Sequence, residues 1–249
     1  MKGHKERKQH RTAGKNAQAA VRPALVRGFA MSNYVLKYKR GEAVKYISHL
    51  DFVRFIQRVI RRAGLAMSFS QGFNPHPLMS VALPLSVGVT ADGELMKISF
   101  EEDYGEEELK KLINSAFPKG FEIIRVKRTE GKEIDFSTLD RAIYICRCQL
   151  KDCPAPDIDA FLENKAINVM KKSKSGVKEA DIRPHIHSLE IIDEANNEIT
   201  LKMCIDAGNN YNLKPDTVIE AMKKYIDGFD VEFYNVHRSA LLAGDREIL

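Results

Sequence analysis

The chain has 249 residues, of which 44% are hydrophobic and 29% charged, an ordinary composition for a globular protein with one large domain or two smaller ones. No run approaches about 18 consecutive apolar residues, and the basic N-terminus has no compact apolar segment before a small-residue cleavage site, so we expect neither a membrane span nor a secretory signal. The glycine motifs of nucleotide-binding loops and the H-E-x-x-H motif of zinc proteases do not occur in the sequence. We therefore expect a cytoplasmic protein that needs no cofactor or metal and binds no membrane.

The positive charge is concentrated at the N-terminus. Residues 1–30 carry eight Lys or Arg residues and one acidic residue, a net charge of +7, whereas the whole chain carries +5, so residues 31–249 carry −2. Residues 1–30 lack hydrophobic periodicity up to about Val26, which predicts a flexible basic tail. Two interpretations of this tail stay open: it binds nucleic acid without sequence preference, or the natural start is Met31, where the first strand-like run opens.

Apolar periodicity in the first half predicts the order β-α-β-β-α-β. Residues 34–40 alternate as a strand, and residues 48–65 have the period of an amphipathic helix with Ser48 as its N-cap. The later elements are a strand within 78–89, a turn at 90–94, a strand at 95–102, a helix at 105–117 that ends before Pro118, and a strand at 121–128.

The second half follows a polar connector at 129–140 and repeats this order. Its expected elements are a strand at 141–150, a helix at 156–172, a strand at 177–192, a turn at 193–198, a strand at 199–207, a helix at 214–226 and a strand at 229–241. Two successive patterns of this kind indicate an α+β protein made of tandem ferredoxin-like units, with the helices on one face of each sheet. The predicted boundaries are 31–130 for the first unit and 139–240 for the second.

One face of the predicted first helix is polar and basic. The residues that recur there at helical spacing are Asp51, Arg54, Arg58, Arg61 and Arg62. His49 and Asp51 stand at the helix N-terminus, where free backbone N–H groups favour an anion. The alternative interpretation is a solvated helix face with a weak ion pair between Asp51 and Arg54.

The heptapeptide QGFNPHP, residues 71–77, presents a histidine on a stiff loop. Pro75 and Pro77 fix their own φ and push the residues before them, Asn74 and His76, out of the α region. Alone this is ordinary turn chemistry, but beside a basic helix it favours an anion-binding or nucleic-acid-binding surface. The side chains expected to converge at one end of the first unit are those of His49, Asp51, Arg54, Gln71, Asn74 and His76.

Cysteine and histidine positions give weaker signals. The cysteines form no C-x-x-C framework, so buried and reduced thiols are favoured over metal ligands; they are Cys146, Cys148, Cys153 and Cys204. His185 and His187 alternate beside Arg183 on a predicted strand, and His237 lies on the last predicted strand. A histidine cluster for a metal is an open alternative, but histidines that are exposed or hydrogen-bonded within the protein are favoured.

The string YISHLDFVRFIQRVIRRAGLAMSFSQGFNPHPLMSVALPLSVGV, residues 46–89, resembles the radical-SAM-linked domain of unknown function, which occurs alone or fused behind cobalamin-binding radical SAM proteins. The resemblance is close across about residues 32–130 and weaker in the second half, where VKEADIRPHI carries it. Besides Gly72, Pro75, Pro77 and Pro184, the matching positions are those we assign to anion or RNA binding: His49, Asp51, Arg54, Arg58, Arg61, Gln71, Asn74, His76 and Arg183.

The resemblance implies that a radical SAM protein is the partner. The chain itself has no C-x-x-x-C-x-x-C motif, so it cannot hold the iron–sulfur cluster of those enzymes, and we favour a role other than catalysis.

Three functions fit these observations. The first is an accessory module that holds ribosomal or transfer RNA, with arginines on phosphates and with Tyr34 and Tyr38 stacked on bases unless the core buries them. The second is a metal-independent RNA endonuclease of tandem ferredoxin-like type, by fold analogy alone, with His49 or His76 as general acid or base. The third is an adaptor that docks on the radical SAM partner without RNA, which the near-neutral charge of residues 31–249 favours.

Overall fold

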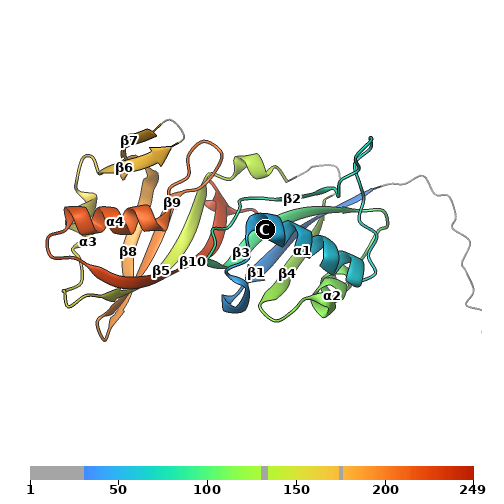
Figure 1. The fold of residues 1–249 in the computed structure, drawn as a ribbon, viewed down its shortest axis with the longest axis horizontal. Helices are drawn as coiled ribbons and strands as arrows, with labels where there is room; N and C mark the ends of the chain where they lie inside the picture. Colours follow the sequence, from blue (N-terminus) through green and yellow to red (C-terminus); the bar gives the residue numbers. More distant parts are fainter. Residues whose placement is uncertain (1–30, 130–133, 174–175) are drawn as a thin grey trace, which may run out of the picture.

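The computed structural model describes residues 31–129, 134–173 and 176–249, which form a mixed α+β fold around one large, mostly antiparallel sheet (Figure 1). The segment 1–30, expected to be a flexible tail, lies outside the described residues. Among the described helices, none is both long and apolar enough to cross a membrane. The antiparallel pairing agrees with the α+β class that the sequence predicts.

The first half of the chain has the element order β-α-β-β-α-β. Its elements are β1 (Ser32–Arg40), η1 (Glu42–Val44), α1 (His49–Arg62), β2 (Met79–Val81), β3 (Thr90–Phe100), α2 (Glu106–Ala116) and β4 (Phe121–Thr129). The strands follow β4-β1-β3 across the sheet, and β2 pairs with the C-terminal part of β3. Both α-helices bury apolar residues in one cluster against these strands, and α1 contributes Phe52, Ile56 and Ile60 at helical spacing.

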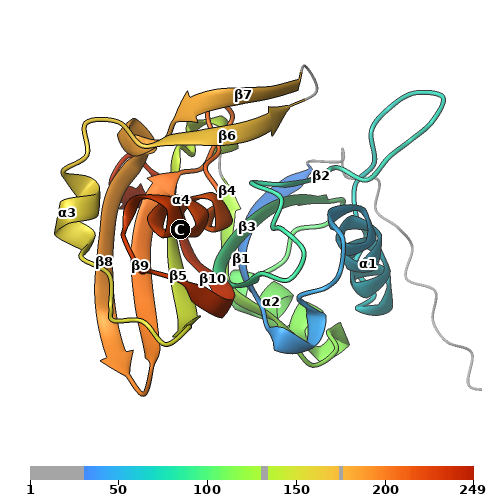
Figure 2. The ribbon, with the colours of Figure 1, turned by 60° about the vertical axis from the view of Figure 1, so that its left-hand side comes forward.

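The second half has the same order with a hairpin inserted after its first α-helix. Its elements are η2 (Phe136–Thr138), β5 (Arg141–Leu150), α3 (Ile158–Leu162), β6 (Asn168–Ser173), β7 (Gly176–Asp181), η3 (Arg183–His185), β8 (Ile186–Ala195), β9 (Glu198–Asp206), α4 (Pro215–Tyr225), β10 (Val231–Ala243) and β11 (Arg246–Glu247). The long strands follow β10-β5-β9-β8 and pair antiparallel. The hairpin β6–β7 is a separate two-stranded sheet (Figure 2).

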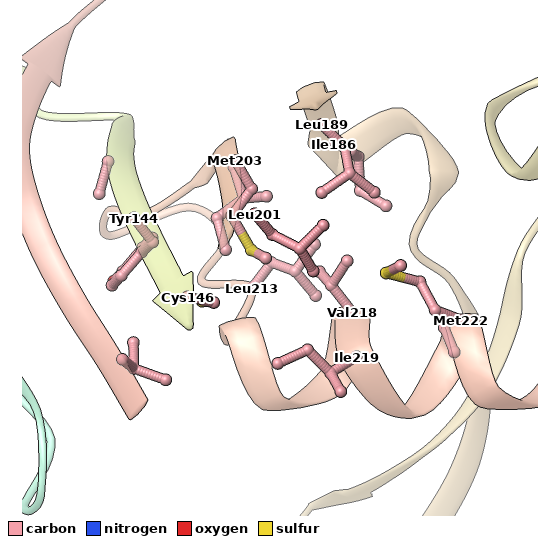
Figure 3. Packing of buried hydrophobic residues seen from close by; sticks show 14 of the residues in the cluster. Tyr144, Cys146, Ile186, Leu189, Leu201, Met203, Leu213, Val218, Ile219 and Met222 are labelled. Atoms are coloured by element: carbon pink, nitrogen blue, oxygen red, sulfur yellow. The ribbon is translucent and has the colours of Figure 1, made fainter. Parts of the chain in front are cut away.

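The second half buries its core on one face of the sheet. Val218, Ile219 and Met222 recur at helical spacing on α4 and lie against Leu201 and Met203 of β9 (Figure 3). All five side chains are fully buried, and each such burial contributes about 1.5–3 kcal/mol relative to exposure. Residues of α3 join the same cluster, so both α-helices cover one face of the strands.

The two halves share one sheet because β3 and β10 run side by side. They are the one parallel pair among the described strands, with Thr90 opposite His237. Gly93 permits this approach, since a Cβ on it would lie 2.5 Å from the carbonyl oxygen of Ser239. The turn predicted at 90–94 is therefore wrong: these residues begin β3, because pairing with neighbouring strands overrides the turn preference of Asp and Gly.

A buried ion pair also joins β3 and β10. Arg238 donates from Nε to Oε1 of Glu94 at 2.7 Å and from Nη2 to Oε2 at 2.6 Å, and the two side chains are only 4% and 0% exposed. Nη2 also donates to the carbonyl oxygen of Leu83 at 2.8 Å. The pair thus ties β3 and β10 to the segment that follows β2.

The helix predicted at 156–172 is wrong beyond its beginning, because α3 already ends at Leu162. The side-chain amide of Asn164 donates to the carbonyl oxygens of Ala160 and Phe161, which satisfies the last carbonyls of the short helix. The chain then enters β6, which pairs with β7. The hairpin was not predicted, because its apolar residues also fit a helical period.

Two predicted strands are shorter than expected. Of the strand expected within 78–89, only β2 forms, and the chain continues through residues 82–89 as an irregular segment. The strand expected at 177–192 is interrupted by η3, where Pro184 has no N–H for a strand ladder.

Candidate nucleic-acid interface

The loop that contains QGFNPHP is closed at its base by Ser70 and His76. The N–H of Ser70 donates to the carbonyl oxygen of His76 at 2.9 Å, and the N–H of His76 donates to Oγ of Ser70 at 3.1 Å. The same Oγ lies 2.8 Å from Nδ1 of His76, and Phe69 pairs with Pro77 just outside the loop. The imidazole therefore belongs to the base of the loop, where it holds the two arms together.

Phe73 occupies the exposed part of this loop and is the residue that sequence reasoning missed. Its relative exposure is 103%, the highest among the large hydrophobic residues described. Gln71 and Asn74 beside it are also exposed, and Figure 2 shows the loop projecting from the body of the first half. The available signal was an aromatic residue placed between Gly72 and a polar residue, without apolar neighbours for a core. An exposed phenyl ring on a closed loop suits stacking against a flat partner.

The α1 helix presents exposed arginines. Ser48 is the N-cap as predicted, because its Oγ accepts from the N–H of Asp51 at 3.2 Å. The ion pair between Asp51 and Arg54 spans 3.6 Å with side chains 62% and 69% exposed, so it contributes only a few tenths of a kcal/mol, about 0.3–0.5. Arg58 and Arg61 are exposed as well. These guanidinium groups keep most of their donors for solvent or for a ligand.

A groove of about 350 Å³ runs along α1 beside these arginines. It is lined by Ile47, Asp51, Phe55, Arg58, Val59 and Arg62. Phe55 stacks on Phe117 and Phe121, with ring centroids 5.9 Å and 4.8 Å away. Arg62 also donates to the carbonyl oxygen of Ala116, which ties α1 to the end of α2. A groove lined by two arginines and one aromatic ring suits a ligand that combines an anion with a flat group, as a nucleotide does.

The predicted residues do not all converge at one end of the first half. His49 and Asp51 begin α1 near the end of β1, where Arg40 donates to the carbonyl oxygen of Ile47. The loop with His76 leaves from the other end, because α1 is 14 residues and hence about 20 Å long. That end lies beside the end of β3, where Met67 bridges to Phe100. The predicted convergence is wrong, and the exposed arginines of α1 lie between the two groups.

Arg183 lies in the second half, apart from this surface. Its Nε donates to the carbonyl oxygen of Leu162 at 2.8 Å, and its Nη1 donates to that of Ile186 at 3.2 Å. Arg183 therefore holds the end of α3 against β8. Its contact with an anion stays a prediction.

His185 and His187 share one carboxylate. Nδ1 of His185 lies 2.7 Å from Oδ2 of Asp206, and Nε2 of His187 lies 2.5 Å from Oδ1. The ring of Tyr211 stacks on His185 with centroids 3.4 Å apart. Within the described ranges, no group of three His, Cys, Asp or Glu residues could hold a metal ion. Both imidazoles thus have a partner inside the protein, the interpretation that the sequence favoured.

Asp206→Asn is expected to destabilise the protein more at about pH 7 than at about pH 3. Burial of Asp206 raises the pKa of its carboxyl, but hydrogen bonds to His187 and His185 outweigh burial and place the pKa below its usual range. The ionised group therefore stabilises the fold fully above its unfolded-state pKa of about 4, and this contribution disappears as the pH falls through the folded-state pKa. Urea unfolding of the unchanged protein and of Asp206→Asn at both pH values measures this contribution. A difference in stability that does not change with pH would contradict the stabilising role of the ionised Asp206.

Two of the four cysteines are buried in the core, whereas Cys153 and Cys204 are half-buried. Cys146 and Cys148 are fully buried, and burial raises the pKa of Cys146 and raises that of Cys148 to about 12. Both remain protonated at neutral pH and are poor nucleophiles and metal ligands. This confirms the buried thiols expected for the strand that bears them.

The tyrosines proposed to stack on bases are in the core. Tyr34 is 0% exposed, and its hydroxyl donates to Oδ1 of Asp103 at 2.8 Å. Tyr38 is 2% exposed and stacks on Phe52. The stacking role is therefore wrong for both, because the alternation of β1 turns these rings toward the helices.

Comparison with known proteins gives one family match and distant structural likenesses. A family model described as "Uncharacterized protein conserved in bacteria (DUF2344)" matches residues 33–215. No curated protein matches the chain.

Three solved structures match the chain at low similarity. In a Cbf5-Nop10-Gar1 complex, the match has 9% identity, a TM-score of 0.44, and covers 84% of this chain and 48% of that chain, so this chain spans about half of its length. An unknown protein from Galdieria sulphuraria matches with 10% identity, a TM-score of 0.24, and coverage of 84% and 98%. A putative glycine cleavage system transcriptional repressor matches with 12% identity, a TM-score of 0.23, and coverage of 84% and 99%. These likenesses are too distant to bear on function.

Proposed function

The chain belongs to the DUF2344 family of uncharacterized bacterial proteins, and we propose that it is a cytoplasmic RNA-binding accessory module of a radical SAM system. It holds ribosomal or transfer RNA while a separate radical SAM protein acts. The resemblance of residues 46–89 to the radical-SAM-linked domain supports the partner. The strand orders β4-β1-β3-β2 and β10-β5-β9-β8 support the further proposal that each half is a ferredoxin-like unit.

One observation carries the RNA-binding proposal: a fully exposed Phe73 on a closed loop lies beyond one end of a helix with exposed arginines. Arginine suits phosphate because its planar fork donates two parallel hydrogen bonds. A phenyl ring stacks on any base, and the closed base of the loop reduces the entropy lost on binding. Arg54, Arg58 and Arg61 would position the backbone of the RNA, and Phe73 would hold an unpaired base.

Phe73→Ala is expected to weaken binding of the full chain to a fluorescein-labelled RNA hairpin with an unpaired loop by about 5- to 100-fold, the effect of losing one base stack. A separate variant that combines Arg54→Ala with Arg58→Ala should also weaken RNA binding. It should reduce the salt dependence of that binding, because two phosphate contacts are lost. Fluorescence anisotropy at several salt concentrations measures both effects.

Met170→Ala and Arg125→Ala are matched controls, because they remove an exposed apolar residue and an exposed arginine from other elements. Equal losses in the controls and the test variants would contradict the proposal. Cleavage of the RNA that depends on His49 or His76 would point instead to the endonuclease. His49 begins α1, whereas His76 lies on the loop that follows the other end of this helix, so we do not expect them to act as acid and base on one phosphate.

A chain that begins at Met31 tests the contribution of residues 1–30. Complete loss of binding in that chain at about 0.1 M salt would show that the tail alone binds RNA by counterion release. Retained capture of a radical SAM protein without RNA would favour the adaptor.

A further inference from the structure

The face of β5 and β10 that points away from α3 and α4 carries a strip of cross-strand pairs. On this face the register pairs Phe233 with Gln149, Asn235 with Arg147, and His237 with Ile145. We call these six residues the sheet strip. The alternate residues of the same strands point into the core, as Cys146 and Cys148 do. The strip is thus the uncovered side of the sheet in the second half.

The side chains of the sheet strip are available to a ligand. Phe233 is 54% exposed, although an aromatic residue in a strand is ordinarily packed against a neighbour. Arg147 and Asn235 are exposed, whereas Gln149 is half-buried and its Nε2 donates to the carbonyl oxygen of Asn197 at 2.9 Å. Among the described residues, no carboxylate forms an ion pair with Arg147. The strip therefore offers an open aromatic ring, the positive charge of Arg147, the amide of Asn235 and the side-chain oxygen of Gln149.

His237 marks one end of the strip, and its ring orientation is fixed. Nδ1 of His237 lies 2.9 Å from Oγ1 of Thr90, and Nε2 lies 3.3 Å from Oδ2 of Asp92. Here the surface deepens into a hollow of about 380 Å³ whose polar lining consists of Glu42, Thr90, Asp92, Arg147, Asn235 and His237. The strip therefore leads from an exposed ring into a concave site with polar walls.

The corresponding face of the first half is covered. Val35 and Leu95 on that face are 1% and 2% exposed. Lys37 pairs with Glu247 at 2.6 Å and donates to the carbonyl oxygen of Leu249 at 3.0 Å, so the C-terminal residues lie over β1. Of the two sheet faces opposite the helices, the second is the one that can receive a ligand.

We propose that the sheet strip binds two or three nucleotides of single-stranded RNA, an inference that rests on the RNA-binding function proposed above. Phe233 stacks on a base, as sheet aromatics do in other single-strand binders. Arg147 pairs with a phosphate, the amide of Asn235 donates to and accepts from base edges, and the side-chain oxygen of Gln149 accepts. A protein partner would call for a wider apolar surface, and Phe233 is the one strongly exposed apolar side chain of the strip.

The test compares single-stranded and double-stranded RNA. Phe233→Ala and Arg147→Ala in the full chain should each weaken binding of fluorescein-labelled octauridylate by about 5- to 100-fold, while binding of a labelled RNA duplex changes less than twofold. The duplex hides its bases in the stack and meets only the arginines of α1. Ultraviolet cross-linking to octauridylate should label the tryptic peptide 225–238, and Phe233→Ala should remove that label.

The outcomes separate this inference from the proposed function. If Phe233→Ala leaves octauridylate affinity and cross-linking unchanged, the sheet strip is not an RNA site, whatever the α1 variants do. If Phe73→Ala and the α1 variants have no effect but the Phe233 and Arg147 variants do, the strip binds RNA and the interface on α1 is wrong. If the full chain binds neither RNA at about 0.05 M salt, both proposals are overturned. Circular dichroism of each variant checks that its fold is intact.

Discussion

Replacing Glu94 by alanine is expected to lower the free energy of unfolding by about 3–5 kcal/mol, because Arg238 would stay buried without its charged partner. Burial opposes the charge of Arg238, but the adjacent Glu94 outweighs it and holds the pKa of the guanidinium above its usual range. The two hydrogen bonds of this bidentate pair would be lost together. Removing one member of a buried pair leaves a desolvated charge, which costs more than the pair contributes when intact.

Two further variants show whether the uncompensated charge causes the loss. Glu94→Leu combined with Arg238→Met removes both charges and should recover much of the stability, since apolar residues of similar volume often replace a buried pair without loss. Asp245→Ala breaks an ion pair with Arg141 that has the same 2.7 Å spacing but an almost fully exposed carboxylate. It should cost less than about 1 kcal/mol. Urea unfolding measures the free energy of unfolding of the three variants and of the unchanged protein. A loss below about 1 kcal/mol for Glu94→Ala would contradict the prediction.

Local signals in the sequence predicted the elements that depend on local chemistry. Ser48 ahead of an apolar period marked the start of α1, and its Oγ does accept from the backbone. Of the turn predicted at 193–198, the centre is confirmed, because Asn196 and Asn197 both have positive φ, whereas residues 193–195 and 198 belong to β8 and β9. Asparagine tolerates this conformation better than most residues, so the signal lies in the turn residues themselves.

The predictions that failed concern contacts between distant parts of the chain. Residues 90–94 have turn chemistry, and only the pairing of β3 with β10 makes them a strand. Composition cannot reveal this pairing, because the partners are 147 residues apart at Thr90 and His237. The face of β1 that points away from the helices is likewise covered by the C-terminal residues. No periodicity in residues 34–40 indicates this contact.

In the candidate site too, local spacing is predicted correctly and the long-range arrangement is not. Spacing alone placed Arg54, Arg58 and Arg61 on an exposed helix face, and they are exposed. No local pattern separates His49 from His76, because the direction of the chain after α1 depends on how α1 lies against the sheet. The flanking prolines also favour His76 over Phe73 as the site residue, although hydrogen bonds between His76 and Ser70 hold His76 at the base of the loop.

Gly93→Ala is expected to destabilise the protein by about 3 kcal/mol, near the upper end of the usual range for overpacking. The added Cβ would lie 2.5 Å from the carbonyl oxygen of Ser239 and 3.0 Å from the Cα of Ala240. These are backbone atoms of β10, so no side-chain rotation can relieve the clash, and β3 and β10 must move apart. Gly105→Ala is the matched control, because its added Cβ meets nothing closer than 3.7 Å and its φ is −62°.

Separation of β3 from β10 has a signature besides the loss of stability. The amide protons where these strands pair should exchange faster in Gly93→Ala, whereas those between β5 and β9 should keep their protection, because that pairing lies wholly within the second half. Hydrogen exchange followed by mass spectrometry resolves the two regions. Equal stability of Gly93→Ala and Gly105→Ala, or uniform loss of protection throughout the sheet, would mean that the close approach at Gly93 does not hold the two halves together.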